Sequence, residues 1–136
     1  MISVDLARWP LVVYRFANEV TLSQLEAYLA RQEEMLLRRE RSASVVIVES
    51  LRMWETAVVR RQAAWIKEHE DELRRASLGV ALVMTSPLAR GMLKAVLWIQ
   101  PMPQPHKICS TVEEALEWVR ARFAEARIPV DLPKTV

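Results

Sequence analysis

Glycine is scarce in this sequence. Only Gly79 and Gly91 occur among the 136 residues. Loops that cradle a phosphate or a dinucleotide need several closely spaced glycines, because a side chain would keep the backbone away from the ligand. The sequence therefore carries neither a P-loop nor a dinucleotide-binding fingerprint, which excludes the enzyme classes that depend on those motifs.

Cysteine and long apolar runs are equally rare. Cys109 is the single cysteine, so the sequence cannot form an internal disulfide, and this usage is typical of a reducing compartment. The first residues, MISVDL, lack the basic and apolar regions of a signal peptide. No apolar run approaches the roughly 20 residues that a membrane span needs. We expect a cytoplasmic protein without a transmembrane segment.

The sequence also lacks a large excess of either positive or negative charge. The 19 basic and 17 acidic residues leave a net charge of +2, which is weak evidence for nucleic acid, and we expect no nucleic-acid partner. Length and composition are those of one globular domain, predicted to span residues 1–136. Residues 128–136 contain two prolines and are predicted to form a C-terminal extension, docked or frayed.

Short apolar runs alternate with helical patterns along the chain. Strands are predicted over residues 11–16, 45–49, 79–84 and 106–110, because these runs are short and the first two are rich in β-branched residues. Residues 2–5 are a candidate fifth strand, turning back through residues 8–10. The alternation predicts an α/β fold with a four-stranded, mostly parallel sheet, to which the N-terminal strand would add an antiparallel edge.

The helices are predicted mainly from their start signals. Thr21 and Gln24 have the spacing of a capping box, and the helix that follows is predicted to reach about Arg41. A second helix is predicted over residues 56–75, with Val59, Ala63, Ile66 and Leu73 facing inward. Ser86 and Pro87 start a third helix, which ends before Pro101. The fourth begins at Ser110 or Thr111, with Glu113 or Glu114 completing its cap.

Ligand sites of parallel sheets lie where the strands end and the next helices begin. After the strand over 45–49 comes a loop with Trp54, a candidate exposed anchor, and then Arg60 and Arg61. Arg90 and Lys94 follow the next strand. None of these four cations has an acidic residue at helical spacing, which predicts an anion site, although a merely solvated surface explains the same pattern.

The helix that starts at Pro87 has almost no polar face. A helix that is apolar all round is either buried or contacts another molecule. Burial in the fold and a contact surface for a partner or a homo-oligomer are both consistent with the sequence. If the helix is a contact surface, Leu97, Trp98 and Met102 are its predicted centre.

No catalytic constellation is visible. Cys109 alternates with Ile108 along a predicted strand, as a buried inert thiol would. His69 and His106 have no metal-ligand spacing around them, and no nucleophile, base and acid can be assembled into a triad. We therefore expect no enzymatic activity, no cofactor and no metal.

The order of strands and helices resembles the SpoIIAA-like family, which is related to STAS and SEC14 domains. The resemblance covers nearly the whole chain and rests on the architecture and on two segments, VVIVESLRMWETAVVRRQAAWI and SPLARGMLKAVLWIQPMPQPHKI, followed by EEALEWV. Antagonist members carry a phosphorylated Asp-Ser pair at the start of the second helix. The matching residues here are Glu55 and Thr56, so the resemblance implies Thr56 as the phosphorylation site.

Together these features predict a non-catalytic regulatory or scaffolding module. It would bind a protein partner, or a second copy of itself, through the loop after residues 45–49 and through the third helix. The alternative is a carrier of a small ligand or lipid, which would hold an anionic headgroup with Arg60, Arg61 and Arg90.

Overall fold

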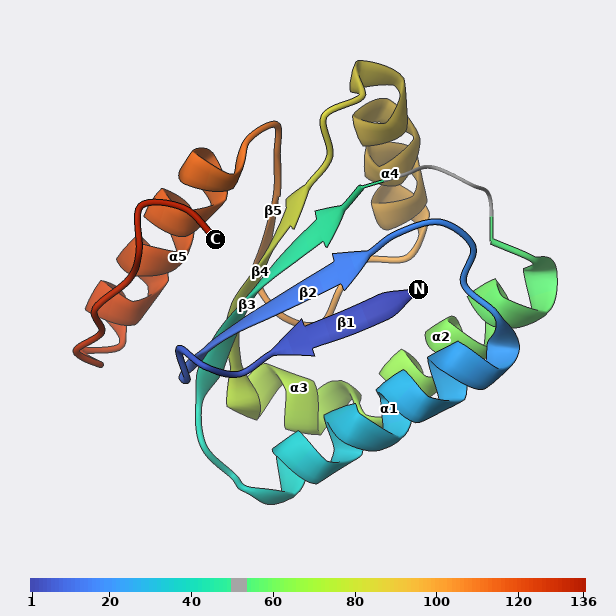
Figure 1. Cartoon of the computed structure of the whole chain (residues 1–136). Helices are drawn as coiled ribbons and strands as arrows, with labels where there is room; N and C mark the ends of the chain where they lie inside the picture. Colours follow the sequence, from blue (N-terminus) through green and yellow to red (C-terminus); the bar gives the residue numbers. More distant parts are fainter. Residues whose placement is uncertain (50–53) are drawn as a thin grey trace.

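The protein is described by a computed structural model that covers residues 1–49 and 54–136. Strands and helices alternate through most of the chain (Figure 1). In order they are β1 (Ile2–Asp5), β2 (Leu11–Phe16), α1 (Leu22–Leu37), β3 (Ser42–Val48), α2 (Thr56–Glu68), α3 (Glu70–Ala76), β4 (Ser77–Val83), α4 (Pro87–Ile99), β5 (His106–Cys109) and α5 (Val112–Glu125). No helix of the described ranges is long and apolar enough to span a bilayer.

The five strands form one sheet in the order β1-β2-β3-β4-β5. Strand β1 is antiparallel to β2, and the other neighbours are parallel. This confirms the predicted α/β fold, including the N-terminal edge strand. Strands β3 and β4 begin before their apolar runs, because Ser42 and Ser77 already pair with each other in the sheet.

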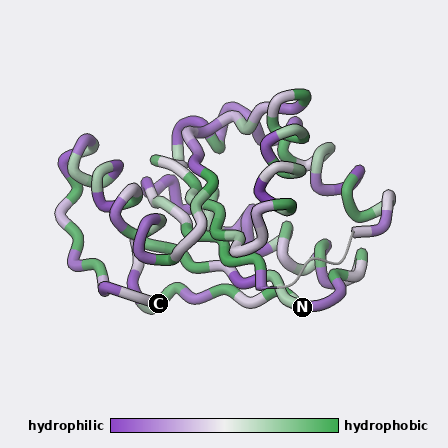
Figure 2. Tube along the Cα trace, turned by 90° about the horizontal axis from the view of Figure 1, so that it is seen from above, coloured by the Kyte–Doolittle hydropathy of each residue, from purple (hydrophilic) through white to green (hydrophobic). Residues whose placement is uncertain are grey.

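The helices divide between the two faces of the sheet. Parallel connections are right-handed almost without exception, so connections that step in one direction along a sheet place their helices on one face. Helices α1, α2 and α3 pack on that face, and α5, which follows the last strand, covers the other (Figures 1 and 2). The sheet is thus the middle layer of three.

The face under α5 is tightly filled. Alternate strand residues, such as Val13, Val45 and Val83, point toward this helix, which buries Ala115, Leu116, Val119 and Phe123 completely. Residues of the C-terminal extension, among them Ile128 and Leu132, pack against the same cluster. Of the two predicted states of that extension, the structure shows the docked one.

The remaining strand residues, which alternate with those above, point to the opposite face of the sheet. Val12, Tyr14 and Val46 point toward α1 and α2, where they meet buried residues such as Leu25 and Trp65. The sheet therefore has an apolar layer on each side, as expected for a parallel sheet covered by helices.

Three predicted helix starts are confirmed. The Thr21 hydroxyl accepts a hydrogen bond from the Gln24 amide at 3.1 Å, and the Gln24 side chain accepts one from the Thr21 amide. The hydroxyls of Ser86 and Thr111 cap α4 and α5 by accepting hydrogen bonds from the amides of Ala89 and Glu114. Helix α1 ends at Leu37, before the predicted Arg41, because Arg39 adopts a positive φ of 56° that no helix continues through.

The single helix predicted over 56–75 is wrong. The structure has two helices, α2 and α3, separated at His69, whose φ and ψ of −110° and 16° leave the helical region. Of the predicted inward residues, Leu73 is buried and Ile66 packs against the same apolar cluster. Val58 and Trp65 are the buried residues of α2, whereas Val59 is half exposed.

Candidate ligand-binding site

A cavity of about 480 Å³ lies between the sheet and helices α1–α4. Its floor is formed by residues of β2, β3 and β4 that face away from α5, and its walls come from the four helices and from the segment between α4 and β5. The volume lies in the range of sites that enclose small organic molecules. Representative lining residues are Tyr14, Phe16, Ser44, Val46, Leu82, Val59, Gln62, Ile66, Leu93, Val96, Leu97, Met102 and Gln104.

Small side chains leave this space open. Ser42, Ser44 and Ser77 lie on the floor, and Ser42 and Ser77 pair with each other across β3 and β4. Ser44 lies in register between Val12 of β2 and Val80 of β4. Helix α4 buries only Ala89 among its own residues, so it does not fill the volume that the serines leave.

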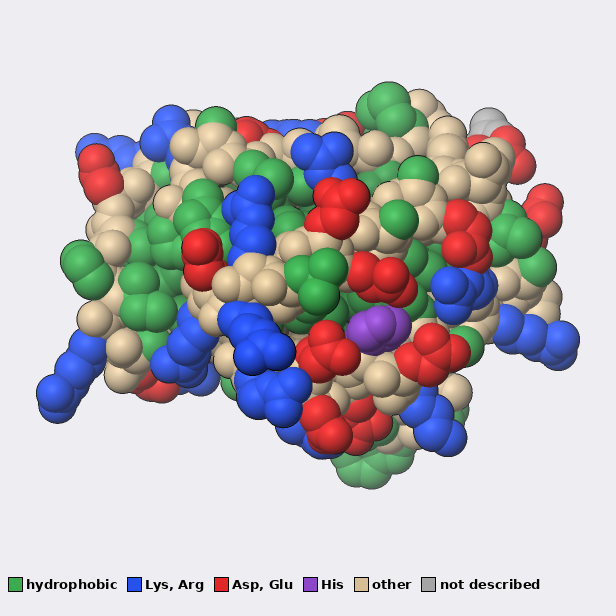
Figure 3. Space-filling view, turned by 90° about the horizontal axis from the view of Figure 1, so that it is seen from below, with side chains coloured by type: hydrophobic (Ala, Val, Ile, Leu, Met, Phe, Trp, Pro, Cys, Tyr) green, Lys and Arg blue, Asp and Glu red, His purple; other side chains and the backbone are tan. Residues whose placement is uncertain are grey.

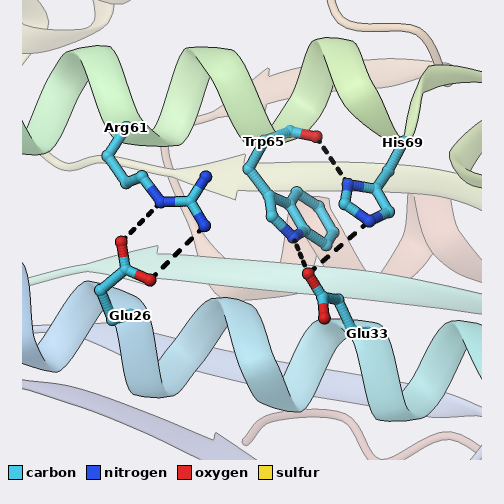
Figure 4. Close-up of polar contacts among 5 residues, drawn as sticks. All are labelled: Glu26, Glu33, Arg61, Trp65 and His69. Atoms are coloured by element: carbon cyan, nitrogen blue, oxygen red, sulfur yellow. Dashed lines mark hydrogen bonds and ion pairs between the residues drawn. The ribbon is translucent and has the colours of Figure 1, made fainter.

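The two helices α1 and α2 are joined by polar contacts between their side chains (Figure 4). Glu26 of α1 pairs with Arg61, the two atoms Oε1 and Nε being 2.5 Å apart. About two turns further along α1, Glu33 accepts a hydrogen bond from Trp65 Nε1 at 3.0 Å, and His69 Nε2 lies 3.7 Å from the same carboxylate. The His69 ring stacks on Trp65 at 4.3 Å between centroids. Trp65, which lines the cavity, is thereby fixed in orientation.

An aromatic cluster closes the end near β2. The Tyr28 ring meets Tyr14 and Phe16 edge to face, each at 5.5 Å between centroids, and Trp54 lies 5.7 Å from Phe16. Gln32 donates a hydrogen bond to the Tyr14 hydroxyl at 2.6 Å. Burial raises the pKa of Tyr14 to about 12 and raises that of Tyr28 as well, so both phenols are neutral at ordinary pH.

The lining is nearly uncharged. Glu40 is the single charged side chain among the described residues that form it. Two amide oxygens, Gln62 Oε1 and Gln104 Oε1, are buried without a hydrogen-bond partner among the described residues. The cavity is therefore apolar, with a few neutral polar groups in its wall.

Comparisons with known proteins bear on the fold. No protein-family model matches the sequence, and no curated protein matches it either. Among solved structures, the chain is similar to the crystal structure of an uncharacterized protein of the DUF3478 family, with a SpoIIAA-like fold, from Shewanella loihica PV-4. The TM-score is 0.65 at 12% identity, and the match covers 88% of this chain and 92% of that one.

The chain has a SpoIIAA-like fold. The predicted resemblance is thereby confirmed for the architecture. An identity of 12% carries the fold alone, so the function of this SpoIIAA-like chain is argued from its own residues.

The three arginines predicted to hold an anionic headgroup lie outside the cavity, and their binding of an anion stays a prediction. Arg61 pairs with Glu26, a residue 35 positions earlier that helical spacing could not reveal. Arg90 donates to the carbonyl oxygens of Met84 and Thr85 at 2.8 and 2.9 Å and so closes the turn between β4 and α4. Arg60 is exposed and forms no ion pair with any described residue. None of the three arginines lines the cavity of this SpoIIAA-like domain.

On the face seen from below, acidic side chains lie beside a group of basic side chains (Figure 3). Lys94, the fourth predicted cation, is exposed on α4.

The predicted contact residues divide into two groups. Trp98 is 88% exposed. Leu97 and Met102 are half-buried and line the cavity. Trp54 was predicted as an exposed anchor, but it is half-buried against Phe16 and lines the cavity too. Partner binding by these residues stays a prediction.

Part of the predicted partner-binding loop lies outside the described residues, namely positions 50–53. Thr56 is exposed as the first residue of α2, and its phosphorylation stays a prediction. A phosphate there would lie at the positive end of the helix dipole.

The residues that sequence reasoning missed are the serines of the floor and the two glutamines of the wall. The signal for Ser42, Ser44 and Ser77 was present, since serines on the inner face of otherwise apolar strands indicate space or a polar contact. Gln62 and Gln104 had no such signal, because only the assembled fold shows that they are buried.

Cys109 is buried, as predicted. Burial raises the pKa of its thiol to about 11, which keeps the thiol protonated at neutral pH. Within the described residues no three histidine, cysteine, aspartate or glutamate side chains gather as metal ligands would.

Proposed function

We propose that this SpoIIAA-like domain is a non-catalytic, cytoplasmic binding protein that encloses an apolar small molecule between its sheet and helices α1–α4. The observation that carries the proposal is the cavity of about 480 Å³ with its almost uncharged lining. Protein interiors are otherwise close-packed, so an apolar space of this size is a default ligand site.

The size of the cavity indicates the size of the molecule. Ligand sites span roughly 300–1,000 Å³, and the volume of about 480 Å³ lies in the lower half of that range. A medium-length alkyl chain or a compact ring system fits this estimate.

The lining supports binding without chemistry. The described residues that form it include no histidine, cysteine, lysine or arginine. A serine nucleophile needs an adjacent base, and histidine is the commonest general base, so the serines of the lining have no histidine there to activate them. The cytoplasmic location is inferred from the single reduced cysteine.

A neutral fluorescent probe, N-phenyl-1-naphthylamine, tests the proposal. We expect saturable binding with a blue-shifted emission. Ser44→Leu places a larger side chain on the cavity floor and should weaken probe binding about tenfold, as expected from overpacking. Ser23→Leu makes the same change at an exposed position of α1 and should leave binding unchanged.

The proposal is wrong if the wild-type protein does not bind the probe. It is also wrong if Ser44→Leu, with a native circular dichroism spectrum, binds as tightly as Ser23→Leu. In that case the probe would occupy the surface instead of the cavity.

A second candidate function is that of a regulatory or scaffolding module that binds a protein partner or a second copy through α4. Leu88, Trp98 and Ile99 are 75%, 88% and 78% exposed. Large exposed apolar side chains on one helix are typical of contact surfaces. This observation supports the candidate independently of the cavity.

Light scattering tests the self-association form of this candidate. We expect the wild type to have the mass of an oligomer and Trp98→Glu to have that of a monomer with an unchanged circular dichroism spectrum. Gln100→Glu adds the same charge at the exposed end of α4 and should not dissociate the oligomer. A monomeric wild type contradicts self-association and leaves only a foreign partner for this surface.

A further inference from the structure

The polar and apolar residues of the cavity floor are separated along the central strand. The residues of β3 that line the cavity are Ser42, Ser44, Val46 and Val48, which lie at alternate positions and share one face of the sheet. The first two carry hydroxyl groups, and the last two are aliphatic. The floor therefore changes from polar to apolar over the length of β3, which is about 20 Å at 3.3 Å per residue.

The strands on either side of β3 follow the same order. Strand β4 begins with Ser77, which pairs with Ser42, and its lining residues end with Met84. On β2, Phe16 pairs with Val48. The cavity thus has a serine end, formed by Ser42, Ser44 and Ser77, and an apolar end, formed by Phe16, Val48 and Met84.

The hydroxyls of the serine end are open to the cavity. Ser42, Ser44 and Ser77 form no side-chain hydrogen bond with any described residue, yet, unlike Gln104 Oε1, their oxygens are not sealed from solvent. Ser44 is half-buried and lies between Val12 of β2 and Val80 of β4. The adjacent Val45 points to the filled layer under α5, so the accessible side of Ser44 faces the cavity.

The open hydroxyls favour a ligand that brings its own hydrogen-bonding group to this end. A purely apolar molecule would strip water from the serines and leave them without partners, which is unfavourable. A hydroxyl both donates and accepts, and so can replace that water.

Charged groups are less suited to the same place. The described lining residues include no lysine or arginine, so a carboxylate would lose its hydration without gaining a cation. Glu40, the single charged residue among them, is exposed to solvent, where an ion pair with an ammonium group contributes little.

We propose that the cavity binds an uncharged single-chain amphiphile in one orientation. Its terminal hydroxyl forms a hydrogen bond with the Ser44 hydroxyl, and its apolar chain extends toward Phe16 and Val48. Along β3, Val48 lies about 13 Å from Ser44. This inference rests on the proposed function and specifies the class of ligand and its direction in the same cavity.

Four ligands with the same eight-carbon chain test the class. Octan-1-ol, 1-methoxyoctane, octanoate and octylamine compete with N-phenyl-1-naphthylamine at neutral pH, where the acid and the amine are charged. We expect the alcohol to displace the probe at about fivefold lower concentration than the ether, because the ether lacks a donor. Both charged ligands should compete less well than the alcohol.

Ser44→Ala and Ser23→Ala form the matched pair of variants. Ser44→Ala removes the hydroxyl and adds no bulk, so the probe should still bind while the preference for the alcohol over the ether disappears. Ser23 is exposed on α1 and does not line the cavity, and Ser23→Ala should keep the fivefold preference.

A crystal structure with 8-bromooctan-1-ol tests the orientation. The anomalous signal of the bromine marks the end of the chain that is remote from the hydroxyl. We expect this signal beside Phe16 and Val48. Bromine beside Ser42 and Ser77 would contradict the proposed orientation.

The competition results can also overturn the inference. Equal competition by alcohol and ether, or a charged ligand as the best competitor, contradicts it in the wild-type protein alone, even if Ser44→Ala fails to fold. A preference that survives in Ser44→Ala contradicts the role of Ser44. If the probe binds without any ligand preference, only this inference fails, whereas absence of probe binding also removes the proposed function.

Discussion

The two faces of the sheet are built from the same strands but are filled differently. Under α5 the side chains of Leu116, Val119 and Phe123 are at most 1% exposed, and the helix lies directly on β3, β4 and β5. On the opposite face a cavity of about 480 Å³ remains beneath α1–α4. The strands decide this difference in part, since the serines of β3 and β4 point to the open face. One face is thus closely packed, and the other retains open space.

Truncating the filled face should have the largest effect. Phe123→Ala removes a fully buried ring and should lower the free energy of unfolding by about 3–5 kcal/mol. Leu97→Ala, on the cavity wall, should cost less than about 1 kcal/mol, because its side chain already borders empty space. Guanidinium unfolding of both variants measures the difference. Equal losses would mean that the faces are equally packed.

Overpacking the filled face should have the next largest effect. A Cβ atom at Gly79 would lie 2.6 Å from Trp118 Cη2 and 3.3 Å from the carbonyl oxygen of Pro105. Gly79→Ala should therefore destabilise the protein by about 1–3 kcal/mol. Gly91, which has no heavy atom within 4 Å of the corresponding position, provides the control. Gly91→Ala should not destabilise, because it also improves the helix propensity of α4. Thermal unfolding of the two variants decides whether the face under α5 has space to spare.

Two glutamine substitutions on the open face should change the free energy of unfolding by smaller amounts and in opposite directions. Gln104→Met removes a buried oxygen without a partner and should stabilise the ligand-free protein by about 1 kcal/mol. Gln32→Met removes the donor to the Tyr14 hydroxyl and should destabilise it by a similar amount. Denaturant midpoints compare the two. A loss of stability in Gln104→Met would show that its amide has a partner in the folded protein.

Local signals predicted much of the fold. The capping residues Thr21, Ser86 and Thr111 mark the starts of three helices, and short apolar runs mark the strands. The break at His69 was missed because neither glycine nor proline marks it. The helix ends where the His69 ring stacks on Trp65 and both meet Glu33 of another helix, which is a tertiary contact.

The site was less predictable than the fold. Arg61 looked free of acidic neighbours because its partner, Glu26, is distant in sequence. The apolar helix α4 was expected to be either buried or exposed for contact, and it combines the two states. Leu93 and Leu97 face the cavity, while Trp98 and Ile99 point to solvent. A cavity depends on how several elements fit together, so no single segment of sequence reveals it.

A crystal structure under xenon pressure tests the contrast between the two faces most directly. Xenon enters apolar cavities and leaves packed interiors empty. We expect xenon density between β3, β4 and α4, in contact with Val46 and Leu82, and none between the sheet and α5. Absence of xenon beneath α1–α4, or xenon only beneath α5, would contradict the account.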